Sequence, residues 1–245
     1  MRVGRVQTER GPRQVVERAG EWAVVEDVFA HPLVFTGERY ATDAVRPLAP
    51  CEPTVVVGIS HNRGNNDHVL PIQAFLKSSR TIAGHGDAVP YVDDIGVVNM
   101  EGELAIVIGS HCRNLTRENA FDAVFGYTIA NDVTNAGQVA VDEKFTQVKN
   151  GENYTPLGPW IETELSAPDA LSIRMVVNGQ ERLTSSTARL PSDLADVLVY
   201  ATKWMALGPG DVVLTGAPNT SIAVHPGDVV DISIADLGTL SNRVT

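Results

Sequence analysis

One stretch of the chain, residues 97–108, constrains the fold more than any other; it reads V-V-N-M-E-G-E-L-A-I-V-I. The unbroken apolar run at its end is typical of a strand that is buried on both faces. Because side chains alternate along a strand, Glu101 and Glu103 are expected to project from the same face. Two carboxylates in a partly dry site repel each other unless a cation lies between them. The stretch therefore predicts a buried strand with a cation site, the alternative being an exposed edge strand with both glutamates in water.

The composition limits the kinds of partner that the chain can have. Its 245 residues are 43% hydrophobic and 20% charged, which is ordinary for a folded protein. The net charge of −11 disfavours non-specific binding to nucleic acid or to an anionic membrane. No apolar leader or long apolar span is present in the sequence, so a cytoplasmic protein is expected. The two cysteines, Cys51 and Cys112, have no C-x-x-C spacing and are expected to be reduced.

The pattern along the chain predicts a mainly β (α+β) fold with a few short helices. Residues 1–50 are interpreted as a small N-terminal β domain and residues 51–245 as the main domain, which begins a series of strand-like runs bounded by turn residues. Helices are expected at 116–125 and at 190–205, with Thr116 and Ser192 as their N-caps. Helices are too few for a repeating βαβ pattern.

A third carboxylate joins the two glutamates as a candidate metal ligand. Asp132 ends the strand-like segment F-G-Y-T-I-A-N-D at residues 125–132. Three carboxylates at strand ends suit a hard divalent cation, Mg²⁺ or Mn²⁺, with positions left for water or substrate. Zinc is less suitable, because no histidine or cysteine has the matching spacing.

Several motifs in this order resemble the fumarylacetoacetate hydrolase family. They are V-N-M-E-G-E-L-A-I-V-I-G, G-Y-T-I-A-N-D-V-T, K-N-G-E-N-Y-T-P-L-G-P, V-N-G-Q and G-P-G-D-V-V-L-T-G-A-P, and the likeness extends from about residue 48 to the end. The resemblance implies the family's mixed β-sandwich roll, a homodimer and a small-molecule 2-oxo or 2-hydroxydienoic acid substrate. It also assigns the metal to Glu101, Glu103 and Asp132.

The resemblance implies roles for further residues as well. Lys149 matches the active-site lysine, which would supply positive charge or relay a proton. Thr215 and Gly216 match the family's T-G-T-P substrate loop, here T-G-A-P. Lys77 and Arg80, in F-L-K-S-S-R, are candidates for binding a distal carboxylate, with solvated surface charges as the alternative.

The chain departs from the family pattern at three places, the mildest of which is Glu152, where the family usually has Asp. Hydrolytic members carry N-Y-x-x-H-x-x-E, whereas S-H-N-R-G-N-N-D stands at 60–67, so the water-activating His-Glu pair is missing in register. His61 or His68 is the candidate replacement acid or base. The family's N-D-x-T-x-R-D is N-D-V-T-N-A-G here, which puts Ala136 at the position of an arginine near the substrate.

These observations favour a metal-dependent isomerase or tautomerase, or a decarboxylase, because proton movement and loss of CO₂ need no activated water. The expected substrate is a 2-hydroxy-2,4-dienedioate or a related 2-oxo acid of aromatic catabolism, whose developing enolate the metal would stabilise. The S-H-N sequence is similar to one half of the family's bifunctional isomerase/decarboxylase. The alternatives are an acylpyruvase-type hydrolase or oxaloacetate decarboxylase, and an inactive metal-binding paralogue.

Overall fold

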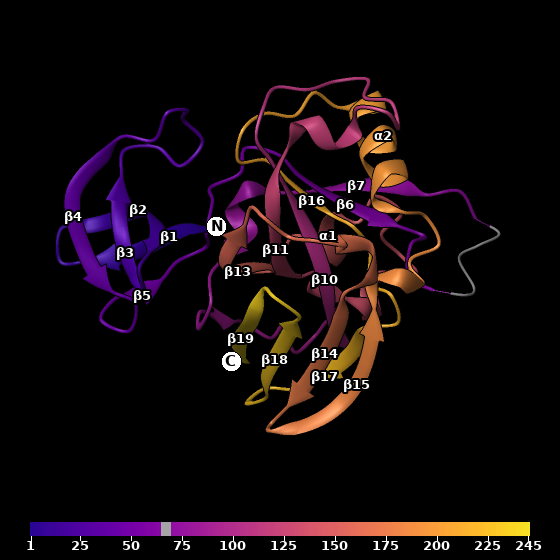
Figure 1. The fold of residues 1–245 in the computed structure, drawn as a ribbon. Helices are drawn as coiled ribbons and strands as arrows, with labels where there is room; N and C mark the ends of the chain where they lie inside the picture. Colours follow the sequence, from indigo (N-terminus) through magenta and orange to yellow (C-terminus); the bar gives the residue numbers. More distant parts are fainter. Residues whose placement is uncertain (65–69) are drawn as a thin grey trace.

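The computed structural model describes residues 1–64 and 70–245, which form a mainly β protein with two sheets (Figure 1). This confirms the predicted fold class. The described helices are two α-helices and a few single turns of 3-10 helix: α1 Thr146–Lys149, α2 Leu194–Trp204, η2 Ser79–Thr81, η3 Ala120–Ala123, η4 Ala136–Gln138, η5 Pro168–Ala170 and η6 Thr187–Arg189. None of these helices has the length and apolar character needed to cross a membrane.

The first 47 residues form a lobe of antiparallel strands beside the rest of the molecule (Figure 1). Its strands are β1 Arg2–Thr8, β2 Gly11–Arg18, β3 Glu21–Val25, β4 Phe35–Ala41 and β5 Arg46–Pro47. Among the described strands of the lobe, the start of β1 alone pairs with the remaining sheet, where Arg2 and Val3 face Glu162 and Ile161. Val3 also packs in a core cluster with residues of the main sheet, so a domain boundary at residue 50 stays a prediction.

The larger sheet continues from this lobe through the centre of the molecule. The strands that follow β1 across it are β13 Thr155–Glu162, β11 Val124–Asn131, β10 Val98–Ile108, β16 Val212–Leu214, β6 Val56–Ser60 and β7 Gln73–Lys77. Three short strands pair beside this path: β8 Ile82–Ala83, β12 Thr134–Asn135 and β17 Ser221–Val224. Residues far apart in the sequence therefore meet along β10.

The central strand β10 changes its partners at the glutamates. Its first four residues pair with β17, and from Gly102 onward it pairs with β11. All of its side chains except Asn99 are buried, so the alternative of an exposed edge strand is excluded. Alternate residues pack in two different core clusters, with Leu104 on one side and Ala105 on the other. Glu101 and Glu103 lie on one side by this alternation, as the sequence predicts.

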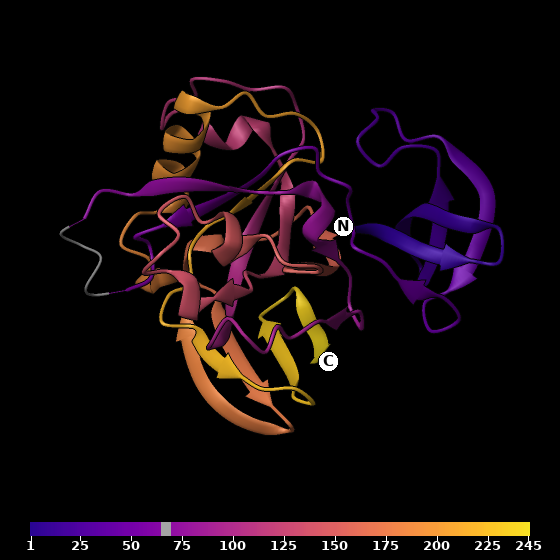
Figure 2. The ribbon, with the colours of Figure 1, turned by 180° about the vertical axis from the view of Figure 1, so that it is seen from behind.

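The smaller sheet packs against β10 from the side of Leu104. Its strands are β15 Gln180–Ser186, β14 Ser172–Val177, β18 Val229–Ile234, β19 Gly238–Val244 and β9 Ala88–Val89. The orange strands β14 and β15 and the yellow strands β18 and β19 lie together in Figure 2. Gly102 faces this sheet, where an added Cβ would lie 2.9 Å from Ile232 Cγ2 and 3.2 Å from Met175 Sδ. A larger residue between the two glutamates would therefore push the sheets apart.

The two predicted helices had different outcomes. The second is confirmed as α2, although Asp193 caps it instead of Ser192, since the Asp193 side chain accepts a hydrogen bond from Asp196 N. The first prediction, a helix over 116–125, is wrong. Only the 3-10 turn η3 forms there, and β11 begins at Val124. The last two residues of the predicted helix, Val124 and Phe125, belong to the strand instead.

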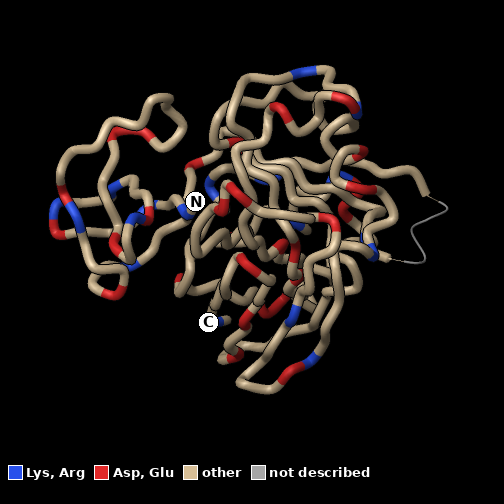
Figure 3. Tube along the Cα trace, viewed as in Figure 1, with Lys and Arg blue, Asp and Glu red and all other residues tan. Residues whose placement is uncertain are grey.

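Charged residues of both signs are interspersed along the chain trace, including the N-terminal lobe (Figure 3). Neither cysteine forms a disulfide, as predicted; Cys51 is buried and Cys112 is partly buried.

Candidate active site

A cavity of about 170 Å³ opens between β6, β7, β10 and the segment that follows β11, and three carboxylates line it. Glu101, Glu103 and Asp132 are almost fully buried, and each offers an oxygen that lies within 4.8 Å of the oxygens of the other two. The structure thus brings together the three residues that the sequence suggested as metal ligands. Their roles as ligands remain a proposal.

Backbone pairing holds the carboxylates in this arrangement. Asp132 follows the last residue of β11, and its amide donates a hydrogen bond to the carbonyl oxygen of Glu101 at 2.9 Å. The Asn131 side chain accepts from the Glu101 amide at 3.2 Å. The antiparallel register between β10 and β11 therefore places Asp132 opposite the two glutamates.

Lys149 reaches the carboxylates from α1, the short helix beyond η4. Its ammonium donates to Asp132 Oδ2 at 2.5 Å, to Glu101 Oε2 at 3.1 Å and to Thr134 Oγ1 at 2.6 Å. The Phe75 ring lies 4.9 Å from the same nitrogen, a cation–π distance. Asp142 fixes α1, because its carboxylate accepts backbone hydrogen bonds at the start of the helix. Lys149 thus faces both the carboxylates and the cavity.

Lys77 has a different place from the one expected. Its side chain is 0% exposed, and its ammonium donates to Asp132 Oδ1 at 2.5 Å and to the Tyr154 carbonyl oxygen at 2.7 Å. The interpretation of Lys77 as a ligand of a distal substrate carboxylate stays a prediction, and the contacts present are with the protein. Lys77 pairs with a candidate metal ligand, so each oxygen of Asp132 accepts from one lysine.

The pKa values of this cluster shift because the charges are buried together. Burial and the charges of Asp132 and Glu101 raise the pKa of Glu103 well above its usual value. Burial also acts to raise the pKa of Asp132, but Lys149 and Lys77 outweigh it and the net shift is downward. Burial lowers the pKa of Lys77, whereas nearby carboxylates outweigh burial and raise that of Lys149.

The donor set fits a hard divalent cation. When all three carboxylates are ionised, they and the two ammonium groups carry one net negative charge in a buried place. Among the described residues, the Gly216 amide gives Glu103 its one hydrogen bond, at 2.7 Å, which is little for a buried carboxylate. Oxygen ligands of this kind are the ones that Mg²⁺ and Mn²⁺ prefer.

The Thr215–Gly216 segment supports the carboxylates from behind. Thr215 is fully buried and its hydroxyl donates to the Leu104 carbonyl oxygen at 2.8 Å, while Gly216 donates to Glu103. Neither residue lines the cavity. Their expected role in binding substrate stays a prediction, and the contacts present are with the protein.

The candidate acid/base residues are only partly placed. His61 lines the cavity and its Nδ1 lies 3.1 Å from the Pro71 carbonyl oxygen. A carbonyl only accepts, so Nδ1 is assigned the hydrogen, and Nε2 is the nitrogen that carries the lone pair in the neutral ring. His68 lies outside the described residues. Gly64, at the register of the family's histidine, has no side chain with which to act.

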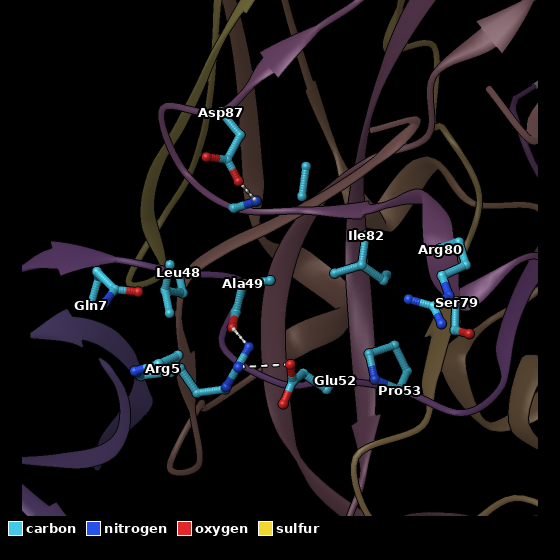
Figure 4. A pocket seen from close by; sticks show the side chains of 13 residues that line it. Arg5, Gln7, Leu48, Ala49, Glu52, Pro53, Ser79, Arg80, Ile82 and Asp87 are labelled. Atoms are coloured by element: carbon cyan, nitrogen blue, oxygen red, sulfur yellow. Dashed lines mark hydrogen bonds and ion pairs between the residues drawn. The ribbon is translucent and has the colours of Figure 1, made fainter. Parts of the chain in front are cut away.

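Arg80 does not line the cavity that the carboxylates share. It lines a second cavity of about 550 Å³ beside the N-terminal lobe, together with the ion pair between Arg5 and Glu52 (Figure 4). The structure therefore separates Arg80 from Lys77, although only two residues lie between them in the sequence. A joint role for the two in binding one distal carboxylate is not supported.

Sequence reasoning missed several residues of the cavity. Thr134, Phe75 and Phe145 line it, and the Thr134 hydroxyl lies 3.0 Å from Glu101 Oε2. Arg63 also lines it, although no motif or spacing in the sequence singles out this residue. Thr134 could have been predicted from the sequence, because it lies two residues after Asp132, just beyond a strand end, where polar residues of functional sites are common.

The chain is similar in sequence to known proteins. The Mycobacterium tuberculosis protein Rv2993c is 33% identical over 100% of this chain and 98% of its own length. Oxaloacetate tautomerase YisK of Bacillus subtilis is 33% identical over 69% of this chain, a match that spans 60% of that protein.

The chain is also similar to solved structures along its whole length. The 5-carboxymethyl-2-hydroxymuconate delta-isomerase from Mycobacterium smegmatis superposes with a TM-score of 0.93 at 35% identity, over 100% of this chain and 99% of the other. A maleylpyruvate hydrolase from Sphingobium sp. SYK-6, in complex with manganese(II) and pyruvate, has a TM-score of 0.81 at 27% identity, over 100% and 99%.

The fold and the buried carboxylates define a class of mixed-β enzymes with an acidic site of the metal-binding type. Residues 55–245 match the profile of the fumarylacetoacetate (FAA) hydrolase C-terminal family, and the chain belongs to that family. The resemblance seen in the sequence motifs is thereby confirmed.

Proposed function

We propose that the protein is a Mg²⁺- or Mn²⁺-dependent isomerase or tautomerase of a 2-hydroxy-2,4-dienedioate or a related 2-oxo acid from aromatic catabolism. The observation that carries the proposal is the buried cluster of Glu101, Glu103 and Asp132 with Lys149 at the cavity. The isomerase with a TM-score of 0.93 supports the choice of reaction class. When bound, the cation supplies a Lewis acid that polarises the 2-oxo group and stabilises negative charge on its oxygen.

The residues around the cluster suit proton movement next to a carbonyl. Lys149 brings a fixed positive charge to the cavity, where it favours developing negative charge on the substrate. His61, with a lone pair assigned to Nε2, is the candidate base that takes a proton from the substrate carbon and returns it elsewhere. The walls that Phe75, Phe145 and Val148 provide are apolar, which limits competing water.

The absence of the family's His-Glu pair at the aligned positions, Gly64 and Asp67, supports isomerisation over hydrolysis. Gly64 cannot hold or activate a water molecule through a side chain. A reaction that leaves the carbon skeleton intact needs only a proton donor and acceptor near the substrate.

A second candidate is cleavage or decarboxylation of the same class of acid. The likeness to a maleylpyruvate hydrolase that binds manganese(II) and pyruvate supports a hydrolase, because that protein shares the fold along the whole chain. Analysis of the products separates this candidate from the first.

Proton NMR in D₂O tests the proposal. The purified protein with Mg²⁺ or Mn²⁺ is mixed with a panel of 2-oxo and 2-hydroxydienoic acids, with exchange read after chelation of paramagnetic Mn²⁺. Metal-dependent deuterium uptake beside the carbonyl, with the carbon skeleton intact, is expected. Loss of CO₂ or of an acyl fragment would move the assignment to a decarboxylase or a hydrolase. A protein that binds the metal and turns over none of the panel would favour an inactive paralogue.

Two variants make the experiment specific to the site. Lys149→Met removes the ammonium at the cavity, and Lys203→Met removes an exposed lysine from α2. Exchange should fall only in the first. We also propose a homodimer, which light scattering of the eluted protein tests.

A further inference from the structure

The second cavity, of about 550 Å³, lies where the N-terminal lobe meets the rest of the molecule (Figure 4). Strand β1 of the lobe contributes one wall, η2 and β8 contribute another, and the segment at residues 48–53 contributes a third. In Figure 4, Arg5 and Gln7 lie on one side and Ser79 and Arg80 on the other. The volume falls within the range of roughly 300–1,000 Å³ that is usual for small-molecule sites. The cavity at the carboxylates, of about 170 Å³, is smaller.

Polar contacts between the walls hold this cavity in shape. Arg5 Nη2 lies 2.8 Å from Glu52 Oε1, and Arg5 Nη1 donates to the Ala49 carbonyl oxygen at 3.2 Å. A second ion pair joins the lobe to the loop after β8, where Arg46 donates to Asp87 Oδ1 at 2.8 Å. The walls are therefore in place before any ligand enters, and a ligand would not have to order them.

The charged side chains at this cavity leave one cation without a partner. Glu52 is paired with Arg5, and Asp87 is paired with Arg46. Arg80 also lines the cavity, but its guanidinium forms no ion pair or hydrogen bond with the described residues. A guanidinium binds a carboxylate or a phosphate through parallel hydrogen bonds. One unpaired guanidinium therefore suits a ligand with one anionic group.

The remaining lining suits an apolar body on the same ligand. The apolar side chains that line the cavity include those of Pro12, Leu48, Pro53 and Ile82. Next to Arg80, the Ser79 hydroxyl also has no hydrogen-bond partner among the described residues, and it can donate to an anion.

We propose that the second cavity binds a small organic anion, a carboxylate or a phosphate monoester, whose anionic group contacts Arg80 and whose apolar chain lies between the lobe and β8. The net charge of the chain is −11, so a local cation is needed to hold an anion here. None of the three carboxylates of the candidate active site lines this cavity, so the inference does not depend on the proposed reaction.

Saturation-transfer NMR titrations of the Mg²⁺-loaded protein test the inference through binding. The probes are hexanoate, hexyl phosphate and the neutral hexanamide, which have similar apolar chains. At least one anion should bind with a dissociation constant of about 1 mM or lower, and hexanamide should bind at least about 10-fold more weakly, since it lacks the charge. The anion that binds more tightly identifies the site as one for carboxylates or for phosphate monoesters.

Variants assign the binding to one cavity. Arg80→Gln should weaken the preferred anion by about 10-fold and leave hexanamide unchanged, because a charge-assisted hydrogen bond is lost. Gln7→Glu adds a negative charge on the facing wall and should also weaken the anion. Arg182→Gln, at an exposed position of β15, and Lys149→Met, at the cavity of the carboxylates, should leave the dissociation constant unchanged. Arg80 and Gln7 are exposed, so both variants should keep the melting temperature of the wild type.

Several results would overturn the site. They are equal affinity for hexanamide and the anions, no binding of either anion below about 10 mM, and anion binding that Arg80→Gln leaves unchanged. Binding that is lost in Lys149→Met and retained in Arg80→Gln would assign the anion to the cavity of the carboxylates instead. Each of these results leaves the proposed function to its own test by deuterium exchange.

Discussion

Two clusters in this protein are both built from ion pairs between acidic and basic side chains, but one cluster is buried and the other is exposed to solvent. In the first, Asp132 lies between Lys77 and Lys149, and these side chains are at most 7% exposed. In the second, Arg117 lies between Asp193 and Asp196 on the surface, and all three side chains are about half exposed. Short ion pairs are present in both, so geometry alone does not distinguish them.

The environment decides what each cluster contributes. Water and salt screen the pairs of Arg117, and exposed pairs of this kind contribute little to stability. In the buried cluster every charge depends on its partners, because an unpaired charge away from water is costly. The buried cluster also holds more carboxylates than ammonium groups, and this surplus of negative charge is what suits it to a cation.

The largest expected effect is that of Asp132→Asn. The change leaves Lys77 and Lys149 buried beside a neutral amide, which should lower the free energy of unfolding by about 3–5 kcal/mol and abolish metal binding. Urea unfolding and calorimetric titration with Mn²⁺ measure the two effects. Asp196→Asn is the matched change in the surface cluster. It should change the free energy of unfolding no more than an ordinary surface substitution does, and it should leave metal binding unchanged. Equal losses in both variants would contradict the comparison.

Next in size is Glu103→Gln, in which function and stability should separate. Because the pKa of Glu103 is raised, its stabilising contribution is present below the usual Glu pKa and is lost as pH rises through the raised value. Without metal, the variant should therefore be at least as stable as the wild type above pH 4.5, the reference value, and the difference should grow with pH. Metal at 100 times its Kd should add about 2.7 kcal/mol to the wild type only. Thermal melts with EDTA or with Mg²⁺, at several pH values, measure both effects.

The two buried lysines should differ from each other. Lys149→Met should lower turnover by about 10²-fold to 10⁴-fold, because Lys149 faces the cavity. Lys77→Met should act mainly on stability, since the ammonium of Lys77 is held by Asp132 and a backbone carbonyl oxygen. Steady-state kinetics and urea unfolding of both variants provide the measurement. The opposite assignment of effects would show that Lys77 takes part in the chemistry.

The smallest effect concerns the surface cluster. Hydrogen bonds from Arg117 lower the pKa of Asp193, so its stabilising contribution is present above the usual Asp pKa and is lost as pH falls through the lowered value. Arg117→Met should weaken this acid dependence, since backbone amides of α2 still lower the pKa of Asp193, and should shift the melting temperature at neutral pH by no more than about 2 °C. Melting curves between pH 2 and pH 7 check it. A shift as large as that of Asp132→Asn would remove the distinction between the clusters.

The strands of the main sheets were largely predictable from the sequence, and the short helices were not. Apolar runs such as that of β10 define a strand by themselves, because the alternation and the length agree. The segment at 116–125 has apolar residues at helical spacing, but the pairing of β11 with β10 begins within it, at Val124, and overrides the local preference. At α1, by contrast, a helix forms where none was predicted. It is a single turn that Asp142 stabilises by accepting backbone hydrogen bonds, and such contacts leave no periodic pattern in the sequence.

The residues of the candidate site likewise include some that the sequence predicts and some that it does not. Glu101 and Glu103 were predictable because one strand carries both, and Asp132 because a strand ends there. Arg63 was not predictable, since its place at the cavity depends on the hydrogen bonds of Asn62 and Asn219 with segments more than 100 residues away. Lys77 and Arg80 appeared equivalent in the sequence, yet one lies in the carboxylate cluster and the other beside the N-terminal lobe.

The sequence by itself determined that a buried strand carries two carboxylates on one face, because the period of a strand is fixed by its backbone geometry. It also determined the family, through motifs that lie in a fixed order. Only the tertiary structure decided which charges share the site, because the pairing of β10 with β11 and the burial of Lys77 bring together residues that are distant in the chain. Local rules fix the direction in which a side chain points, but long-range packing fixes what it meets.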